Sequence, residues 1–218
     1  MKKSDALNAS FQPENFEFTD SKAVDKIIAR YPKGRQASAI MPLLDLAQRQ
    51  VAETGPFGDL PTGGGWIPRA AMDEIANIVD VPPIKVYEVA TFYSMYNLEP
   101  VGKYLVQLCT TTPCWLCGSA DVVNACKDHL GINLWQTTED GYFTLMEVEC
   151  LGACTNAPMV QINDLYYEDL TAERMVAILD SLKQDRIPEA GPQNGRNKSM
   201  AITGPTTLEE QAKKAGVA

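Results

Sequence analysis

The positions of the cysteines constrain this chain more than any other feature. All six lie between residues 109 and 154 of a 218-residue sequence, and four of them form two spaced pairs. The pairs are C-x4-C (Cys109 and Cys114) and, 35 residues later, C-x3-C (Cys150 and Cys154). Each pair follows a strand-like stretch, 103–109 or 142–149. Two parallel, neighbouring strands would bring both loops to one end of a sheet, so the four thiols are expected to converge.

Four convergent thiolates are soft ligands, which select zinc, Cu(I) or iron–sulfur. Structural zinc favours C-x2–4-C pairs, and both spacings fall within or at the edge of that range. A [2Fe-2S] cluster needs two cysteines on each of two irons, which suits two separated pairs. The residues between the ligands, 110–112 and Gly152, also leave backbone N–H groups free to face negatively charged sulfides. The pattern favours iron–sulfur and keeps zinc as the main alternative.

Cys117 allows two further interpretations. With Cys114 it forms a C-x-x-C motif ahead of a predicted helix, a placement that favours thiol–disulfide chemistry. With Cys109 and Cys114 it also matches the C-x4-C-x2-C spacing of plant-type ferredoxins, in which Cys150 or Cys154 would be the fourth ligand. Plant-type ferredoxins have a ubiquitin-like fold, with strands where this chain has a predicted helix after Cys117. The two-pair arrangement and the ferredoxin arrangement each leave one cysteine over.

Other reactive side chains have simpler interpretations. Cys126, within the predicted helix Ser119–Leu130, is expected to be a small buried hydrophobe. His129, the only histidine, is expected at the surface near the end of that helix, where a cation is favourable. Glu147 and Glu149 lie on the same side of one strand and are expected in solvent. A functional interpretation is that their negative charge lies near the metal site and lowers the reduction potential of a cluster there.

The periodicity predicts an α/β (α+β) fold with two domains and a tail. Residues 1–97 contain four helical stretches, at 20–29, 35–53, 68–79 and 84–96, and are expected to form an N-terminal helical bundle. Residues 98–186 alternate between strand and helix, with a hairpin around Asn163-Asp164 and a last helix at 171–183. Residues 187–218 are expected to be an extended or disordered tail.

Charge and composition narrow the range of partners. The net charge is −9, and residues 98–187 carry 5 basic and 13 acidic side chains, or −8. Such a surface argues against nucleic acid and anionic lipid as partners, although residues 75–93 resemble a helix–turn–helix. No apolar run approaches the ~18 residues of a membrane span, so no membrane insertion is expected. The first ten residues lack the apolar run of a secretory signal, so the cysteines are expected to be reduced.

The chain also lacks sequence signals for holding a dinucleotide. No G-x-G-x-x-G follows a predicted strand, and the glycine-rich stretch 62–66 lacks the Lys-Ser/Thr of a phosphate loop. A role that uses a dinucleotide would therefore need a partner subunit to bind it.

Three segments resemble one family. CTTTPC, FTLMEVECLGACTNAPMVQIND and YYEDLT are similar to the small, 24-kilodalton-type [2Fe-2S] subunit of respiratory complex I, NADH:quinone oxidoreductase. The resemblance covers about residues 15–185. It implies a thioredoxin-like domain behind a helical one, and one [2Fe-2S] cluster held by Cys109, Cys114, Cys150 and Cys154. It assigns no role to Cys117 or to the tail.

The resemblance also implies an assembly. A larger subunit would bind FMN and NADH and carry a [4Fe-4S] cluster, and other peripheral-arm subunits would lie nearby. The chain would be peripheral, on the cytoplasmic side of a bacterial inner membrane or the matrix side of a mitochondrial one. Two alternatives remain: the equivalent subunit of an NAD-dependent formate dehydrogenase or NAD-reducing hydrogenase, and a zinc-stapled interaction subunit without a redox role.

Overall fold

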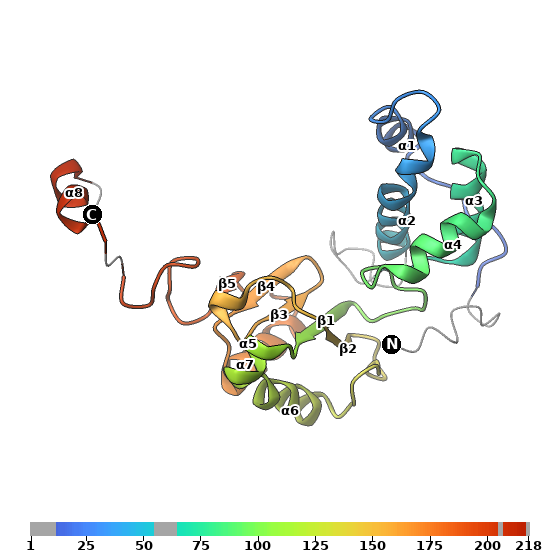
Figure 1. Cartoon of the computed structure of the whole chain (residues 1–218). Helices are drawn as coiled ribbons and strands as arrows, with labels where there is room; N and C mark the ends of the chain where they lie inside the picture. The colour runs from blue at the N-terminus through green and yellow to red at the C-terminus, as the bar shows by residue number, and fades with distance from the viewer. Residues whose placement is uncertain (1–11, 55–64, 205–206, 217–218) are drawn as a thin grey trace. The chain divides into compact units, whose positions relative to one another are not determined.

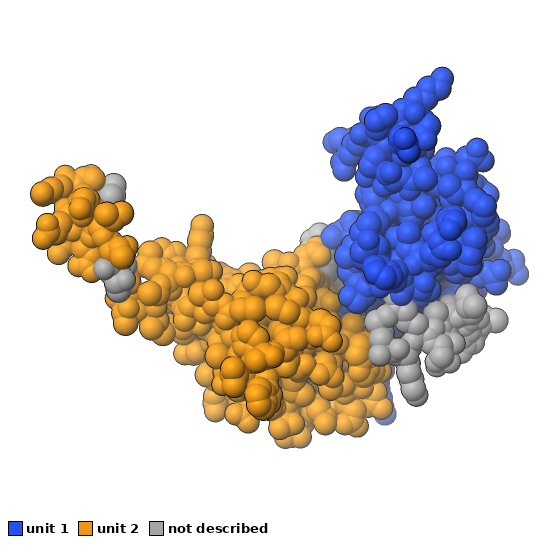
Figure 2. All heavy atoms as spheres, viewed as in Figure 1, with its two compact units in different colours: residues 1–105, 139–143 blue, residues 106–138, 144–218 orange. Residues whose placement is uncertain are grey.

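The computed structural model describes residues 12–54, 65–204 and 207–216. The chain divides into two compact units (Figure 2): Met1–Leu105 with Glu139–Phe143, and Val106–Thr138 with Thr144–Ala218. Most of the predicted glycine-rich loop, including residues 62–64, lies outside the described residues. No helix within the described ranges is long and apolar enough to cross a membrane.

The first unit is helical (Figure 1). Its elements are α1 (Ser21–Ile28), the 3-10 turn η1 (Gln36–Ala39), α2 (Ile40–Thr54), α3 (Arg69–Val79) and α4 (Pro83–Phe92). Each α-helix contributes an apolar face to one core, and its fully buried members include Leu43, Leu44, Ile75 and Val86. The four helical stretches predicted from periodicity are all present.

Local chemistry explains where these helices begin. The Asp20 carboxylate accepts a hydrogen bond from the Ala23 N–H at 2.9 Å and caps α1. Pro42 lies in the first turn of α2, where a missing N–H costs nothing. Pro83 likewise occupies the first turn of α4.

The predicted end of the fourth helix, at Tyr96, is wrong. The helix α4 stops at Phe92 because Tyr93 adopts extended backbone angles, φ −84° and ψ 127°. Tyr96 is instead buried, and its hydroxyl donates to the Met41 carbonyl at 3.0 Å. Burial against a residue 55 positions away overrides the helical periodicity.

The second unit is a sheet with helices. In chain order it contains β1 (Tyr104–Cys109, whose first two residues belong to the first unit), α5 (Thr112–Leu116), α6 (Ser119–Leu130), β2 (Phe143–Val148), η2 (Cys154–Asn156), β3 (Val160–Ile162), β4 (Leu165–Glu168), α7 (Ala172–Lys183), β5 (Gly191–Pro192) and α8 (Glu209–Ala215). The strand order is β2-β1-β3-β4-β5 (Figure 1). The mixed helix-and-sheet class is confirmed.

The neighbours β1 and β2 lead into the two cysteine loops. Near their starts, Lys103 N donates to Gly141 O at 2.9 Å and Tyr104 N donates to Tyr142 O at 2.7 Å. Near their ends, the Thr110 hydroxyl lies 2.6 Å from a Glu147 carboxylate oxygen. The contacts advance together along both segments, so the two strands run in the same direction, as predicted.

The hairpin and the helices α5 and α6 show where local sequence signals succeed and where they fail in this unit. The hairpin is confirmed: Val160 pairs with Tyr167, and Asn163 turns the chain at φ +51°. The Ser119 hydroxyl is a possible cap for α6, but the capping residue is Gly118, at φ +92°, and Ser119 is the buried first residue of the helix. The short helix α5 lies where a plain loop is predicted.

The segment after α7 is anchored to the sheet in part. Gly191 and Pro192 form the edge strand β5, parallel to β4 and paired with Tyr167 and Glu168. Further on, Arg196 forms an ion pair with Asp169 at 3.0 Å. The terminal helix α8 has no buried residue.

Candidate metal centre

The first cysteine pair is buried. Cys109 is the last residue of β1, and Cys114 lies in α5, which begins three residues later. Their exposed fractions are 2% and 1%. With Met159 they form a small apolar cluster, against which Leu151 and Tyr166 pack. The first pair is therefore shielded from water by apolar side chains.

The second pair is exposed. Cys150 follows β2, and Cys154 begins the turn η2. Their sulfur atoms lie 3.4 Å apart. Gly152, between them, has a φ of +89°, which L side chains rarely adopt. This backbone turn allows two cysteines four residues apart to present their thiols side by side.

Contacts between the loops bring the two pairs together. The Leu151 N–H, from the second loop, hydrogen-bonds the Cys109 sulfur of the first. The Thr111 hydroxyl, from the first loop, hydrogen-bonds the Cys150 sulfur of the second. Electrostatic interaction also links Cys154 with Cys114. The structure thus brings all four predicted cysteines into one site.

Within each pair, one thiol releases its proton more readily than the other. Burial opposes ionisation of Cys109, but hydrogen bonds from Thr111, Cys114 and Leu151 hold its pKa below the ordinary value. Burial, and then the hydrogen bond with Cys109, raise the pKa of Cys114 to about 12.

The exposed pair shows the same asymmetry. The backbone N–H of Gly152, followed by Cys154, lowers the pKa of Cys150. The hydrogen bond with Cys150 is the main cause of the raised pKa of Cys154. In each pair, therefore, the thiol whose pKa is lowered, Cys109 or Cys150, loses its proton at lower pH than its partner.

This donor set fits a two-iron cluster. Backbone N–H groups are directed at the sulfurs of three of the paired cysteines and stabilise negative charge there; they belong to Thr111, Leu151, Gly152 and Met159. The thiols lie as two pairs, and each iron of a [2Fe-2S] cluster takes two cysteines. Within the described part of the chain, no three His, Cys, Asp or Glu side chains surround a single metal position.

The remaining candidates lie outside this constellation. Cys117 is exposed at the end of α5, while Cys114 interacts with Cys109 rather than forming a C-x-x-C couple. Cys126 is fully buried, as predicted, and burial raises its pKa to about 12. The His129 Nε2 lies 2.9 Å from Asp180 Oδ1, so it links α6 to α7.

Sequence reasoning missed a polar cluster directly behind Cys154. Asn156, two residues on, is buried and hydrogen-bonds a carboxylate oxygen of Asp169 and the carbonyl of Lys198. Arg196 completes the cluster from the segment after α7. The single Arg in a stretch of Gly, Asn and Pro gives no local signal of such a contact.

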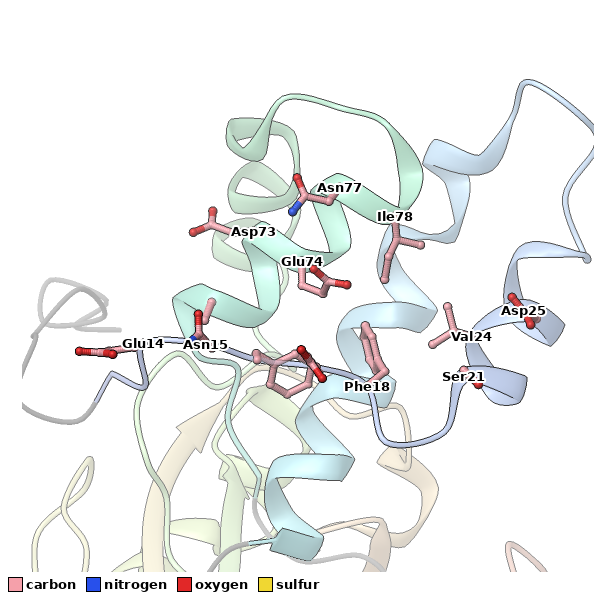
Figure 3. Close-up of a pocket in the computed structure, with 13 residues that line it drawn as sticks. Glu14, Asn15, Phe18, Ser21, Val24, Asp25, Asp73, Glu74, Asn77 and Ile78 are labelled. Atoms are coloured by element: carbon pink, nitrogen blue, oxygen red, sulfur yellow. The ribbon is translucent and has the colours of Figure 1, made fainter.

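A separate cavity of about 640 Å³ lies in the helical unit (Figure 3). Its wall combines the aromatic pair Phe16 and Phe18 with carboxylates from α1, α3 and the segment before α1. No thiol or basic side chain is among its described lining residues. It offers no donor set for the chemistry of the cysteine site.

A family model describes most of the chain. The model of the thioredoxin-like [2Fe-2S] ferredoxin matches residues 24–183. This match spans both compact units and includes all four paired cysteines. It confirms the thioredoxin-like fold predicted for the cysteine-containing domain.

Close relatives carry names from one respiratory enzyme. The chain is 46% identical over 216 residues to the mitochondrial NADH dehydrogenase [ubiquinone] flavoprotein 2 of Dictyostelium discoideum, covering 95% of this chain and 83% of the relative. It is 51% identical over 178 residues to an NADH-quinone oxidoreductase subunit of Rickettsia bellii, covering 82% of this chain and 96% of the relative.

Solved structures share less with the chain. An NAD+-reducing [NiFe]-hydrogenase matches 54% of this chain and 20% of its own at a TM-score of 0.49 and 24% identity. A thioredoxin-like [2Fe-2S] ferredoxin from Aquifex aeolicus matches 43% of this chain and 97% of its own at a TM-score of 0.34 and 18% identity. The sequence matches cover 95% and 82% of the chain, enough to include the four-cysteine site. The chain belongs to the thioredoxin-like [2Fe-2S] ferredoxin family, and its close relatives there are named as parts of NADH-quinone oxidoreductase.

Proposed function

We propose that this chain is an electron-transfer subunit of NADH:quinone oxidoreductase and holds one [2Fe-2S] cluster on Cys109, Cys114, Cys150 and Cys154. The convergence of these four thiols from two loops carries the proposal. The relatives named for that enzyme, which match over 83% and 96% of their own length, support it.

The ligand loops provide what such a cluster requires. When bound, the cluster accepts and releases one electron at a time. Buried Cys109 and Cys114 hold one side away from water, and exposed Cys150 and Cys154 leave the other open to a partner. The N–H groups directed at the sulfurs offset the negative charge of the thiolates.

The remaining parts of the reaction are assigned to other subunits. A larger subunit would bind FMN and NADH and carry a [4Fe-4S] cluster, since this chain lacks a dinucleotide fingerprint. Further peripheral-arm subunits would complete the assembly, on the cytoplasmic side of a bacterial inner membrane or the matrix side of a mitochondrial one. The relatives' names support membership of a multi-subunit enzyme.

The proposed domain organisation follows from the same assignment. Residues 1–97 would form the helical N-terminal domain, 98–186 the cluster domain and 187–218 the tail. The boundary between compact units after Leu105 supports a division near this point.

Surface charge predicts a low reduction potential. Reduction adds negative charge to a centre that is already anionic, and residues 98–187 carry −8. The repulsion favours the oxidised state, so a midpoint near or below roughly −400 mV is expected.

Iron and sulfide analysis with EPR after dithionite reduction tests the proposal. We expect two irons and two sulfides per chain, with the signal lost in Cys109→Ser, Cys114→Ser, Cys150→Ser or Cys154→Ser. Cys117→Ser is the matched control and should keep the signal. Stoichiometric zinc without an EPR signal would contradict the proposal, as would loss of the cluster in Cys117→Ser.

Co-purification tests the identity of the assembly. A quinone-reducing membrane enzyme is expected to retain the chain. A soluble molybdenum or nickel enzyme in its place would identify the formate dehydrogenase or hydrogenase alternative.

A further inference from the structure

The turn that carries Cys154 is held from behind by a segment far along the chain. Cys154 begins η2, and Thr155 and Asn156 complete it. The Arg196 guanidinium donates from one nitrogen to the Thr155 carbonyl at 3.0 Å, and a second nitrogen lies 3.0 Å from Asp169 Oδ1. One side chain therefore ties a residue next to a proposed ligand to the end of β4.

Every polar group of Asp169 has a partner. Its carboxylate faces Arg196 and the Asn156 amide, its N–H donates to Asn156 O at 2.8 Å, and its carbonyl accepts from Arg174 at 2.9 Å. The Asp169 side chain is only 7% exposed and that of Arg196 only 14%. Such a pair is little screened by solvent, and removing one partner leaves an uncompensated buried charge.

The segment that carries Arg196 is itself fixed at several points. Strand β5 pairs with β4, and the Arg196 N–H donates to the Asn194 side chain at 2.9 Å. Two residues beyond Arg196, the Lys198 carbonyl accepts from the buried Asn156 amide at 2.8 Å. We call residues 191–198 the strap. The strap thus contacts the cysteine turn at two points, through Arg196 on Thr155 and through Lys198 on Asn156, while β5 anchors it to β4.

We propose that Arg196 is a positioning residue for the metal centre: through the strap it fixes the turn from Cys154 to Asn156, and so the exposed ligand pair. The effect on the cluster rests on the proposed function, whereas the effect on the turn does not. The buried pair on β1 and α5 has no such attachment to the strap among the described contacts, so loosening is expected at one loop only.

Hydrogen exchange on the metal-free, full-length chain tests the attachment. In Arg196→Met, which keeps the apolar stem and removes every donor, the Asn156 and Ala157 amides should exchange about tenfold faster. In the wild type these amides donate to the Ala153 and Cys154 carbonyls. The Trp115 amide in α5, bonded to Thr111, should be unchanged.

Matched variants separate positioning from general destabilisation. Arg186→Gln removes an exposed arginine bonded to Gln184 and should behave like the wild type. Arg196→Lys keeps the charge but not both contacts, and should rescue the turn in part. Asp169→Asn combined with Arg196→Met removes the buried charge imbalance and keeps the chain folded, yet the turn should still exchange rapidly.

The loaded protein provides a second measurement. In Arg196→Met the [2Fe-2S] EPR signal should broaden, and the cluster should be lost to a chelator about threefold faster. Deleting residues 205–218, which leaves the strap intact, should change neither.

Two results would overturn the proposal: wild-type exchange at Asn156 and Ala157 in Arg196→Met, or equal acceleration at all amides in the double variant. If the wild-type chain binds no [2Fe-2S] cluster, the proposed function fails, while the exchange experiment still decides the role of the strap.

Discussion

At the residue scale, Gly152 links backbone geometry to the chemistry of the site. Its φ of +89° is one that residues with a side chain rarely adopt, and its N–H hydrogen-bonds the Cys150 sulfur. Its Cβ position is open space, so Gly152→Ala introduces backbone strain without a clash. We expect a loss of about 1–3 kcal/mol in unfolding free energy and incomplete cluster loading, measured as iron per chain.

Gly131 provides the control for this substitution. It ends α6 at φ +67°, also with open space at its Cβ position. Gly131→Ala should lose a similar amount of stability and keep full iron content. Equal iron loss in both variants would mean that Gly152 acts through stability alone.

Burial separates the two cysteines that are not proposed ligands. Burial raises the pKa of the Cys126 thiol to about 12, while Cys117 is exposed. The thiolate reacts with alkylating agents, and at pH 8 a thiol of pKa 12 is only about one ten-thousandth ionised. Peptide mapping after iodoacetamide treatment should find Cys117 labelled within minutes and Cys126 only after unfolding. Comparable labelling of both in the folded chain would contradict this burial.

At the scale of elements, the segment after α4 makes the unfolding free energy sensitive to alkaline pH, because it buries Tyr96. Burial, with Asp45 and Tyr93 adding to it, raises the pKa of Tyr96 from 10 to about 12. The unfolded chain therefore ionises this phenol first as pH rises. Stability from Tyr96 is complete below pH 10 and is lost as the pH rises toward 12.

Comparing Tyr96→Phe with the wild type tests this effect. Between pH 8 and 11.5 the wild type should lose about 2 kcal/mol more unfolding free energy than the variant, by urea denaturation. Phenylalanine cannot bond the Met41 carbonyl, so the variant should be less stable at pH 8. Parallel pH profiles would mean that Tyr96 ionises equally in the folded and unfolded chain, so that folding does not raise its pKa.

At the scale of the whole molecule, charge is unevenly distributed. Residues 98–187 account for −8 of the net −9, and the exposed Glu147 accepts a hydrogen bond from Thr110, next to Cys109. Glu147→Gln keeps an acceptor and removes one charge. We expect the midpoint potential to rise by on the order of 10–40 mV in potentiometric EPR, because reduction then meets less repulsion.

Glu210 in α8 provides the comparison for Glu147. It is exposed and belongs to a helix with no buried residue. Glu210→Gln should leave the potential unchanged, and higher salt should reduce the shift seen with Glu147→Gln. A shift of the same size in both variants would indicate a net-charge effect rather than a local field.

The sequence by itself determined the two cysteine pairs, the strands that lead into them and the number of helices in the first unit. These features follow from local spacing: a period of two for strands, 3.6 for helices, and Pro and Gly at ends. Spacing alone also allowed a set that includes Cys117, and the resemblance to the complex I subunit family implied the four proposed ligands.

Only the tertiary structure decided which pair is buried, where α4 ends and what Arg196 does. Cys109 and Cys114 are covered by residues from the second loop, and Tyr96 leaves the helical pattern to bond Met41. Arg196 acts on Thr155, 41 positions away. Such contacts form because buried polar groups need hydrogen-bond partners, and distant segments supply those partners only when they pack together. Local periodicity does not predict which segments these are.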